Sequence, residues 1–358
     1  MQREFFIDAF EPLTASSLHC TSMFAPRSGR RTCVRTSAMA YYLGIDGGGT
    51  KTRCVLTEET TVLAKSMTGG SNLVRLGEAQ VREALHTAVR QVCVATKISP
   101  DQIGAICVGV AGAARPEIAA KIRSIVAELI PGNASGNAPN VEVVGDAVIT
   151  LEAAFGTGPG VIAIAGTGSI VYGRDAAGRT ARAGGWGFAV SDEGSGHWIG
   201  RRAISAILSA HDQGLETALT AMVLQSWKLT TIDELVQQAN STPPPDFPRL
   251  FPIVLRASDQ ADSLARDLLA HAGAKLAALA VIVIRRLAPP DVTEMPAVAM
   301  LPVAMLPVAM TGSVFRQSPY VRQVFYNALR GSFPGIAVRQ DLADPVEGAL
   351  ARARALHK

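Results

Sequence analysis

The chain of 358 residues is 48% hydrophobic and 18% charged, a composition typical of a soluble protein with one large domain or two packed lobes. Its formal net charge is +4, and half of that excess comes from residues 1–38, which hold five arginines against three acidic residues. The rest of the chain is nearly neutral, which argues against nucleic acid as a partner.

The five cysteines are widely separated and include no CxxC pair, so they favour reduced thiols in a cytoplasmic protein over a disulfide or zinc framework. No apolar run reaches the length of a membrane span. The nearest, residues 276–284, is bracketed by Lys275 and Arg285, so we predict a buried helix there and no association with a membrane.

The first 38 residues are rich in Ser, Thr and Arg and have no apolar periodicity. A targeting peptide has a similar composition, but Glu4, Asp8 and Glu11 are unusual in an organelle transit peptide, and a secretory apolar core is missing. We therefore expect residues 1–38 to be a disordered extension, with Met39 as a candidate for the natural start.

Beyond residue 41, short apolar segments alternate with stretches of helical periodicity, which favours an α/β fold. The segments expected to be strands are residues 42–45, 53–57, 105–110, 141–144, 161–165 and 170–173. Helices with one core-facing apolar stripe are expected from Val81 to Val92 and from Val346 to Ala353. The Gly-rich residues 154–160 mark the expected boundary between two lobes.

Three consecutive glycines follow the first expected strand, in the sequence DGGGTKT that begins at Asp46. A P-loop would require Lys where Thr50 stands, and a dinucleotide fingerprint would lead into a helix rather than directly into a second strand. The glycines therefore predict a hairpin turn whose backbone amides can approach an anion such as phosphate. The alternative is a tight turn with a structural role only.

A second turn has the same pattern, because Gly166, Thr167, Gly168 and Ser169 also stand between two apolar strands. Two such turns are able to grip a polyphosphate from opposite sides. Between them, Asp146 follows another expected strand, at the strand end where α/β sheets present ligand sites, and a carboxylate there suits a general base. The alternative role of Asp146 is to cap the following helix.

Residues 298–310 repeat the five-residue unit VAMLP and then begin it again. The units are too short and too few for a solenoid. Without two of the copies, an ordinary buried strand would lead into the turn at Gly312. We therefore interpret the extra copies as an in-frame duplication, tolerated as an enlarged loop or strand extension; the alternative is a Met-rich binding surface.

Five motifs occur in one order along the chain: DGGGTKT, GDA around Asp146, AGTGS, GGWGFAVSDEGSGHWIG from Gly184, and TGSVF from Thr311. In this order they resemble the BadF/BadG/BcrA/BcrD ATPase family of the actin-like ATPase and sugar-kinase superfamily. Within that family the sequence is most similar to N-acetylglucosamine kinases and related bacterial amino-sugar kinases. The resemblance runs from about residue 41 to residue 356.

This resemblance implies two actin-like (ribonuclease H-like) α/β lobes with nucleotide and sugar in the cleft between them. One lobe would contain residues 41–156 together with 342–358, and the other residues 157–341. Asp46 would act on Mg²⁺, and Asp146 would take the proton from the sugar hydroxyl. The residues that match the phosphate- and adenosine-binding turns for ATP are Gly48, Gly49, Thr50, Lys51, Gly166, Thr167, Gly168, Ser169, Gly312 and Ser313.

The sugar side is implied by a second group of matching positions. Amide and carboxylate side chains suit this work because a sugar hydroxyl both donates and accepts hydrogen bonds. The matching residues are Asn72, Gly185, Trp186, Asp192 and Glu193. Glu193 and Ser195 are equally suited to cap the helix that begins near His197.

The resemblance therefore implies an ATP- and Mg²⁺-dependent kinase acting on an amino sugar, most simply N-acetylglucosamine at the 6-hydroxyl, with a homodimer as a possible assembly. Ile170 replaces an Asn that touches the sugar in animal members, so glucosamine and N-acetylmuramic acid stay open as substrates.

Three other classes of protein are less favoured. An ATPase that activates a partner enzyme would need a close cysteine pair for an iron–sulfur cluster. A DNA-binding sugar sensor would need more than residues 1–38 ahead of the first glycine turn. A purely structural actin-like protein would not need the sugar-type polar groups of Asn72 and the DEGS segment.

Overall fold

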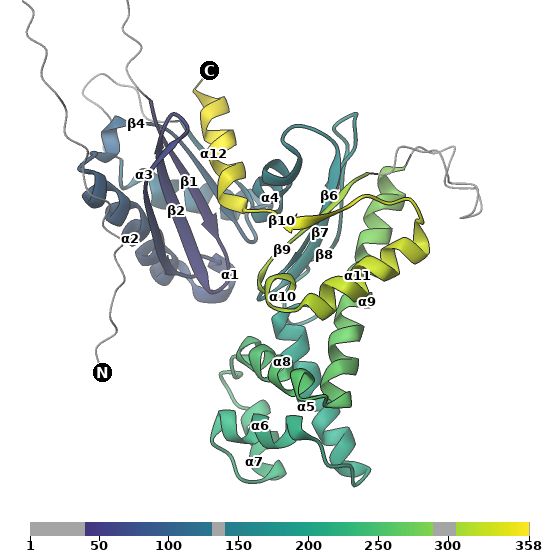
Figure 1. Cartoon of the computed structure of the whole chain (residues 1–358). Helices are drawn as coiled ribbons and strands as arrows, with labels where there is room; N and C mark the ends of the chain where they lie inside the picture. Colours follow the sequence, from purple (N-terminus) through teal and green to yellow (C-terminus); the bar gives the residue numbers. More distant parts are fainter. Residues whose placement is uncertain (1–39, 131–139, 289–305, 358) are drawn as a thin grey trace, which may run out of the picture. The chain divides into compact units, whose positions relative to one another are not determined.

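The computed structural model describes residues 40–130, 140–288 and 306–357 (Figure 1). The compact unit of the chain runs from Met39 to Lys358. The prediction for residues 1–38 and most of the duplicated segment, residues 298–305, lie outside the described residues.

The first sheet has five strands in the order β3-β2-β1-β4-β5. Strands β1, β2 and β3 form an antiparallel meander, whereas β4 and β5 run parallel to β1. Their bounds are Tyr41–Gly47, Lys51–Glu58, Thr61–Gly69, Ile103–Val110 and Asn140–Gly145 for β1 to β5. The short helices α1 (Leu73–Leu76) and η1 (Pro100–Gln102) belong to the connections between these strands.

The second sheet repeats the topology of the first. Its order is β10-β9-β6-β7-β8, in which β6, β7 and β8 form an antiparallel meander and β9 and β10 run parallel to β6. The bounds of β6 to β10 are Gly160–Ala165, Ser169–Arg174, Thr180–Gly184, Val308–Thr311 and Val338–Leu342. If the strands of each sheet are numbered from 1 to 5 along the chain, both sheets have the spatial order 3-2-1-4-5.

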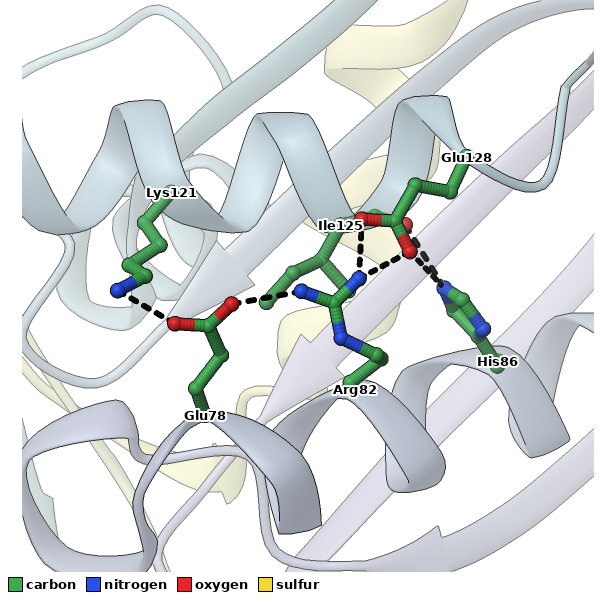
Figure 2. Close-up of polar contacts among 6 residues, drawn as sticks. All are labelled: Glu78, Arg82, His86, Lys121, Ile125 and Glu128. Atoms are coloured by element: carbon green, nitrogen blue, oxygen red, sulfur yellow. Dashed lines mark hydrogen bonds and ion pairs between the residues drawn. The ribbon is translucent and has the colours of Figure 1, made fainter.

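Two helices cover one face of the first sheet. Helices α2 (Glu78–Thr96) and α3 (Pro116–Ala127) bury apolar side chains against β1, β2 and β4, including the predicted stripe from Val81 to Val92. On their outer side Arg82 pairs with Glu78 at 2.6 Å and also with Glu128 (Figure 2). The His86 ring lies 2.9 Å from the carbonyl of Ile125, so this network joins the two helices near the surface.

The other face of the first sheet is covered by a helix from the C-terminal end of the chain. Helix α12 (Pro345–Leu356) packs against β1, β4 and helix α4 (Asp146–Phe155). A Cβ on Gly348 would stand 1.8 Å from the backbone oxygen of Ile149, so the two helix backbones approach closely. The apolar face predicted from Val346 to Ala353 is buried.

The second core is built mainly around helix α9 (Ser263–Leu287), which packs against β6, β7, β8 and α11. By length and composition α9 is able to cross a membrane, but its buried residues belong to this core, as predicted for residues 276–284. The remaining helices are α5 (Gly196–Asp212), α6 (Ala218–Trp227), α7 (Ile232–Ala239), η2 (Phe247–Leu250), α8 (Phe251–Asp259), α10 (Ser313–Gln317) and α11 (Pro319–Ser332).

Candidate functional site

The first glycine turn joins β1 to β2, as predicted. The N–H of Gly48 donates to the carbonyl of Lys51 at 2.9 Å, and the N–H of Ser71 donates to the carbonyl of Gly48 at 3.0 Å. Thr50 and Lys51 are exposed. The turn is therefore held by its own backbone and by the segment before α1, while its tip is open to a ligand.

The second glycine turn joins β6 to β7, the equivalent place in the second sheet. The N–H of Gly166 donates to the carbonyl of Gly168 at 2.9 Å. The first residues of α5 brace this turn, because Gly196 donates to the carbonyl of Gly166 at 2.8 Å and His197 donates to that of Thr167 at 3.2 Å. Ser169 donates its hydroxyl to the carbonyl of Glu193 at 2.8 Å.

The two turns approach each other. A Cβ on Gly49 would stand 3.5 Å from the Cγ2 atom of Thr167. The third turn, between β9 and α10, has Gly312 at φ +103°, and a Cβ there would stand 2.2 Å from the carbonyl oxygen of Ala165. Only glycine allows this approach, which brings Ser313 beside the strand that leads into the second turn.

A cavity of about 990 Å³ opens beside these turns. Gly49 and Thr50 line it from the first turn, Thr167 from the second and Ser313 from the third. Its size lies at the upper end of the range usual for small-molecule and cofactor sites. The three predicted phosphate- and adenosine-side turns therefore border one shared space.

Two carboxylates lie at the carboxyl edge of the first sheet. Asp46 is paired in register with Gly109 of β4, which is paired with Val144 of β5, and Asp146 follows β5 directly. Burial and then the charge of Asp146 raise the pKa of Asp46 to about 6, although Arg53 opposes the shift. A bound cation would relieve the electrostatic repulsion between these two carboxylates.

Asp146 is the first residue of α4, and its Oδ1 accepts a hydrogen bond from the N–H of Ala147 at 2.9 Å. The N-cap position itself belongs to Gly145, so the predicted capping alternative holds only in part. Burial raises the pKa of Asp146, and backbone hydrogen bonds oppose that effect. A carboxylate with a raised pKa is suited to accept a proton.

Asp192 occupies the loop before α5 in an unusual conformation, with φ +66°. Its side chain faces the second turn, because a Cβ on Gly168 would stand 2.9 Å from the Oδ2 atom of Asp192. Burial raises the pKa of Asp192 to about 6, with smaller contributions first from the charge of Glu193 and then from that of Asp146, although the backbone amides of Ser169 and Gly187 oppose the shift. The charge of Asp146 therefore acts on the carboxylate of Asp192.

Asn72 caps α1 with its side chain. Its Oδ1 accepts from the N–H groups of Val74 at 3.1 Å and Arg75 at 3.2 Å. The predicted sugar-binding side chain therefore has a structural role for its oxygen, and its NH₂ group is the part left to donate to a ligand.

The remaining predicted residues lie in the loop that follows β8. Gly185 has φ +68°, and the ring of Trp186 is largely exposed, with the guanidinium of Arg182 over it at 4.0 Å. Glu193 accepts from the hydroxyl of Ser191 at 3.1 Å. Of the two candidate caps of α5, Ser195 is confirmed, because it accepts from the N–H of Trp198 at 3.1 Å, and Glu193 is not the cap.

Three residues near the cavity were missed by the sequence reasoning. Arg75 pairs with Asp246 at 3.1 Å, and both line the cavity. His197 is buried between the rings of Phe188 and Phe247, and burial lowers its pKa to about 4. The only indication in the sequence that Arg75 lies near the site is its position three residues after Asn72. Nothing in the sequence links it to residue 246.

Comparison with known proteins finds amino-sugar kinases among the relatives of this chain. An N-acetylmuramic acid/N-acetylglucosamine kinase of Clostridium acetobutylicum is 38% identical over 200 residues, which are 55% of this chain and 63% of that relative. An N-acetyl-D-glucosamine kinase of Dictyostelium discoideum is 28% identical over 86% of this chain and 96% of its own length.

A solved structure from Chromobacterium violaceum, described as a candidate N-acetylglucosamine kinase, is 29% identical, with a TM-score of 0.67 over 87% of this chain and 98% of that one. The predicted α/β fold with two sheets of actin-like design is confirmed. The model of the BadF/BadG/BcrA/BcrD ATPase family matches residues 43–352. The chain therefore belongs to the BadF/BadG/BcrA/BcrD ATPase family.

Proposed function

We propose that the chain is an ATP-dependent kinase that phosphorylates an amino sugar, with N-acetylglucosamine at the 6-hydroxyl as the first candidate substrate. The observation that carries this proposal is the position of Asp146 directly after β5, where its charge helps to raise the pKa values of Asp46 and Asp192. The kinase activities in the names of the Clostridium and Dictyostelium relatives support it.

On the nucleotide side, the three turns bordering the cavity are proposed to bind ATP. The turns at residues 48–51 and 166–169 would face the phosphates, with the amides of Gly49, Thr50, Thr167 and Gly168 as donors, because those of Gly48, Gly166 and Ser169 already donate within the protein. Gly312 and Ser313 would lie toward the adenosine. Amide groups in such turns attract anions without the cost of immobilising a long side chain. The exposed tip of the first turn and the proximity of Gly49 to Thr167 support this assignment.

Asp46 is the proposed ligand for Mg²⁺. This ion is usually held by one or two carboxylates together with substrate phosphates and water rather than by a cage of protein ligands. Asp46 fits that pattern, because it is a partly buried carboxylate whose charge is opposed by Asp146. When bound, the ion would neutralise charge on the phosphates.

Asp146 is proposed to accept the proton of the acceptor hydroxyl while holding that oxygen in line with the terminal phosphate. Asp192 and the NH₂ group of Asn72 would bind neighbouring hydroxyls, and Gly185, Trp186 and Glu193 would lie around the sugar. Positioning and charge stabilisation supply most of the rate in phosphoryl transfer, so these residues need only fix the two reactants.

We also propose that residues 41–156 with 342–358 form one lobe and residues 157–341 the other, in a cytoplasmic enzyme. The packing of α12 onto the first sheet supports this division. A homodimer remains part of the proposal.

The test is the release of ADP from Mg-ATP across a panel of glucose, glucosamine, N-acetylglucosamine and N-acetylmuramic acid. Asp146→Ala serves as the blank, and Asp101→Ala, an exposed aspartate in η1, serves as the matched control. We expect one amino sugar to stimulate turnover strongly. Asp146→Ala should lower that turnover by about 10²- to 10⁴-fold, the usual contribution of a general base, while ATP binding changes little.

Two results would overturn the proposal. Steady ATP hydrolysis that is indifferent to every sugar would favour an ATPase that activates a partner enzyme. Near-normal turnover in Asp146→Ala would show that Asp146 is not the general base. The response to the sugar panel would still identify the substrate class.

A further inference from the structure

Arg75 of α1 reaches the place where the first two glycine turns meet. A Cβ on Gly49 would stand 3.5 Å from the Nη1 atom of Arg75 and 3.5 Å from the Cγ2 atom of Thr167. The guanidinium thus lies beside the tip of the first turn, on the side that faces the second. The cap made by Asn72 fixes the start of the short helix that carries Arg75.

The other side of this guanidinium is engaged by an acidic residue from the second half of the chain. Its Nη2 atom lies 3.1 Å from Oδ1 of Asp246, in the loop that precedes η2. Both side chains are partly exposed, at 27% and 39%. An ion pair with this exposure contributes little to stability, so exchanging its partner costs little free energy.

Asp246 has a second cationic neighbour. The Nε atom of Arg249 lies 3.1 Å from Oδ2 of Asp246. If Arg75 turns away, the carboxylate therefore keeps an ion pair and is not left alone. Among the described residues that line the cavity, Arg75 and Arg249 are the cationic side chains, and Arg75 is the one whose guanidinium lies beside a glycine turn.

We propose that Arg75 is a phosphate-binding residue, which exchanges Asp246 for the β- or γ-phosphate of the bound nucleotide. The inference deepens the proposed function and rests on its assignment of the glycine turns to ATP. A planar guanidinium binds phosphate through two parallel hydrogen bonds, which are stronger than those of a partly solvated ion pair. Asp246 then acts as a competitor that keeps Arg75 extended toward the cavity while it is empty of phosphate.

This role and a merely structural ion pair predict opposite results. If the pair only holds the two segments together, loss of either partner has the same effect on nucleotide binding. If Arg75 binds phosphate and Asp246 competes for it, removing Arg75 weakens binding and removing Asp246 strengthens it.

The experiment is a fluorescence titration of the full chain with ATP and AMP in the presence of Mg²⁺ and without sugar. We expect Arg75→Gln to weaken ATP binding about 10- to 100-fold, as expected for lost hydrogen bonds to a charged group, and to leave AMP binding unchanged. Asp246→Asn should tighten ATP binding several-fold. Arg75→Lys keeps the positive charge but loses the paired N–H donors of the guanidinium, so its ATP affinity should lie between those of Arg75→Gln and the wild type.

Arg82→Gln is the matched control, because it removes a partly exposed arginine with two acidic partners from the outer side of α2 (Figure 2). It should bind ATP as the wild type does. Equal losses in Arg75→Gln and Asp246→Asn, or equal losses for ATP and AMP, would overturn the proposal. Since no sugar is present, a failure to phosphorylate amino sugars would leave this result unaffected.

Discussion

Two aspartates at equivalent positions of the repeated topology have opposite electrostatic environments. Asp146 follows β5 and Asp344 follows β10, and each lies at the start of the next helix. Arg53 binds both carboxylate oxygens of Asp344 at 2.7 and 2.9 Å, which holds its pKa below the ordinary value against the effect of burial. Within the described residues Asp146 has no such ion pair, which fits the proton-accepting role proposed for it.

Asp192 gives a prediction for the pH dependence of stability. Its pKa is raised to about 6 in the folded protein, above the usual value near 4 of an unfolded chain. The stability that this group contributes is therefore fully present below about pH 4 and is lost as the pH rises through about 6. We expect Asp192→Asn, which cannot ionise, to gain Tm relative to the wild type as the pH rises from about 4 to about 7.

Thermal melts at half-unit pH steps measure this difference. Asp175→Asn is the control of opposite sign, because hydrogen bonds from Arg179 and the backbone lower the pKa of Asp175 despite its desolvation. The Tm of that variant relative to the wild type should stay level above pH 5. A flat difference for Asp192→Asn across the same range would show that its carboxylate is not desolvated.

The close packing of α12 on α4 is an element-level contact on which the stability of the fold depends. Helices approach this closely only where a small residue removes the side chain from the interface, and Gly348 is that residue. Other glycines sit in helices without this demand. Gly331 in α11, for example, has no atom within 4 Å of the place of its missing Cβ.

These two glycines form a matched pair of substitutions. We expect Gly348→Ala to lower the free energy of unfolding by about 2 kcal/mol, because the new methyl group would overlap the backbone of Ile149. Gly331→Ala should raise it by up to about 1 kcal/mol, the difference in helix propensity between the two residues. Urea denaturation of both proteins measures the two changes, and equal effects would contradict the close packing of α12 on α4.

The network on the outer side of α2 and α3 predicts a response to salt. Glu78, Arg82, Lys121 and Glu128 are linked near the surface, where dissolved ions screen their attraction (Figure 2). Arg82→Gln should therefore melt slightly below the wild type in dilute buffer, and the gap should close in about 1 M salt. A gap that is independent of salt would point to lost packing of the arginine stem instead.

The sequence was most informative where local chemistry decides the structure. The glycines at 47–49 and at 166 and 168, with the apolar segments around them, predicted both hairpin turns, because turn formation depends on neighbouring residues. Strands β3, β8 and β10 were not predicted, since they are edge strands in which most residues are exposed or partly buried and no apolar run stands out. The pairs of Arg75 with Asp246 and of Arg53 with Asp344 depend on the tertiary fold and leave no periodic signal.

At the scale of the whole molecule, the two ends of the sequence differ in their expected importance. The compact unit begins at Met39, whereas α12 supplies Val346, Ala349, Leu350 and Ala353 to the core beneath the first sheet. We expect a chain that begins at Met39 to keep the Tm and nucleotide affinity of the full chain. A chain that ends at Asp344 should lose its cooperative melting transition, because the apolar face of the sheet is left in water.

Differential scanning calorimetry of the two truncated proteins tests this asymmetry. The loss of stability on removing residues 1–38, or a sharp transition near the wild-type Tm without α12, would contradict it.

The burial of α12 against strands from the opposite end of the sequence has a consequence for biosynthesis. A ribosome makes β1, β2 and β4 long before it makes the helix that covers them, and domains otherwise tend to fold in the order of their synthesis. The growing chain must therefore carry an uncovered apolar sheet until residues 345–356 have been synthesised. Chaperones that shield such surfaces, and the speed at which the codons for α12 are read, would govern how much of this protein reaches its native state.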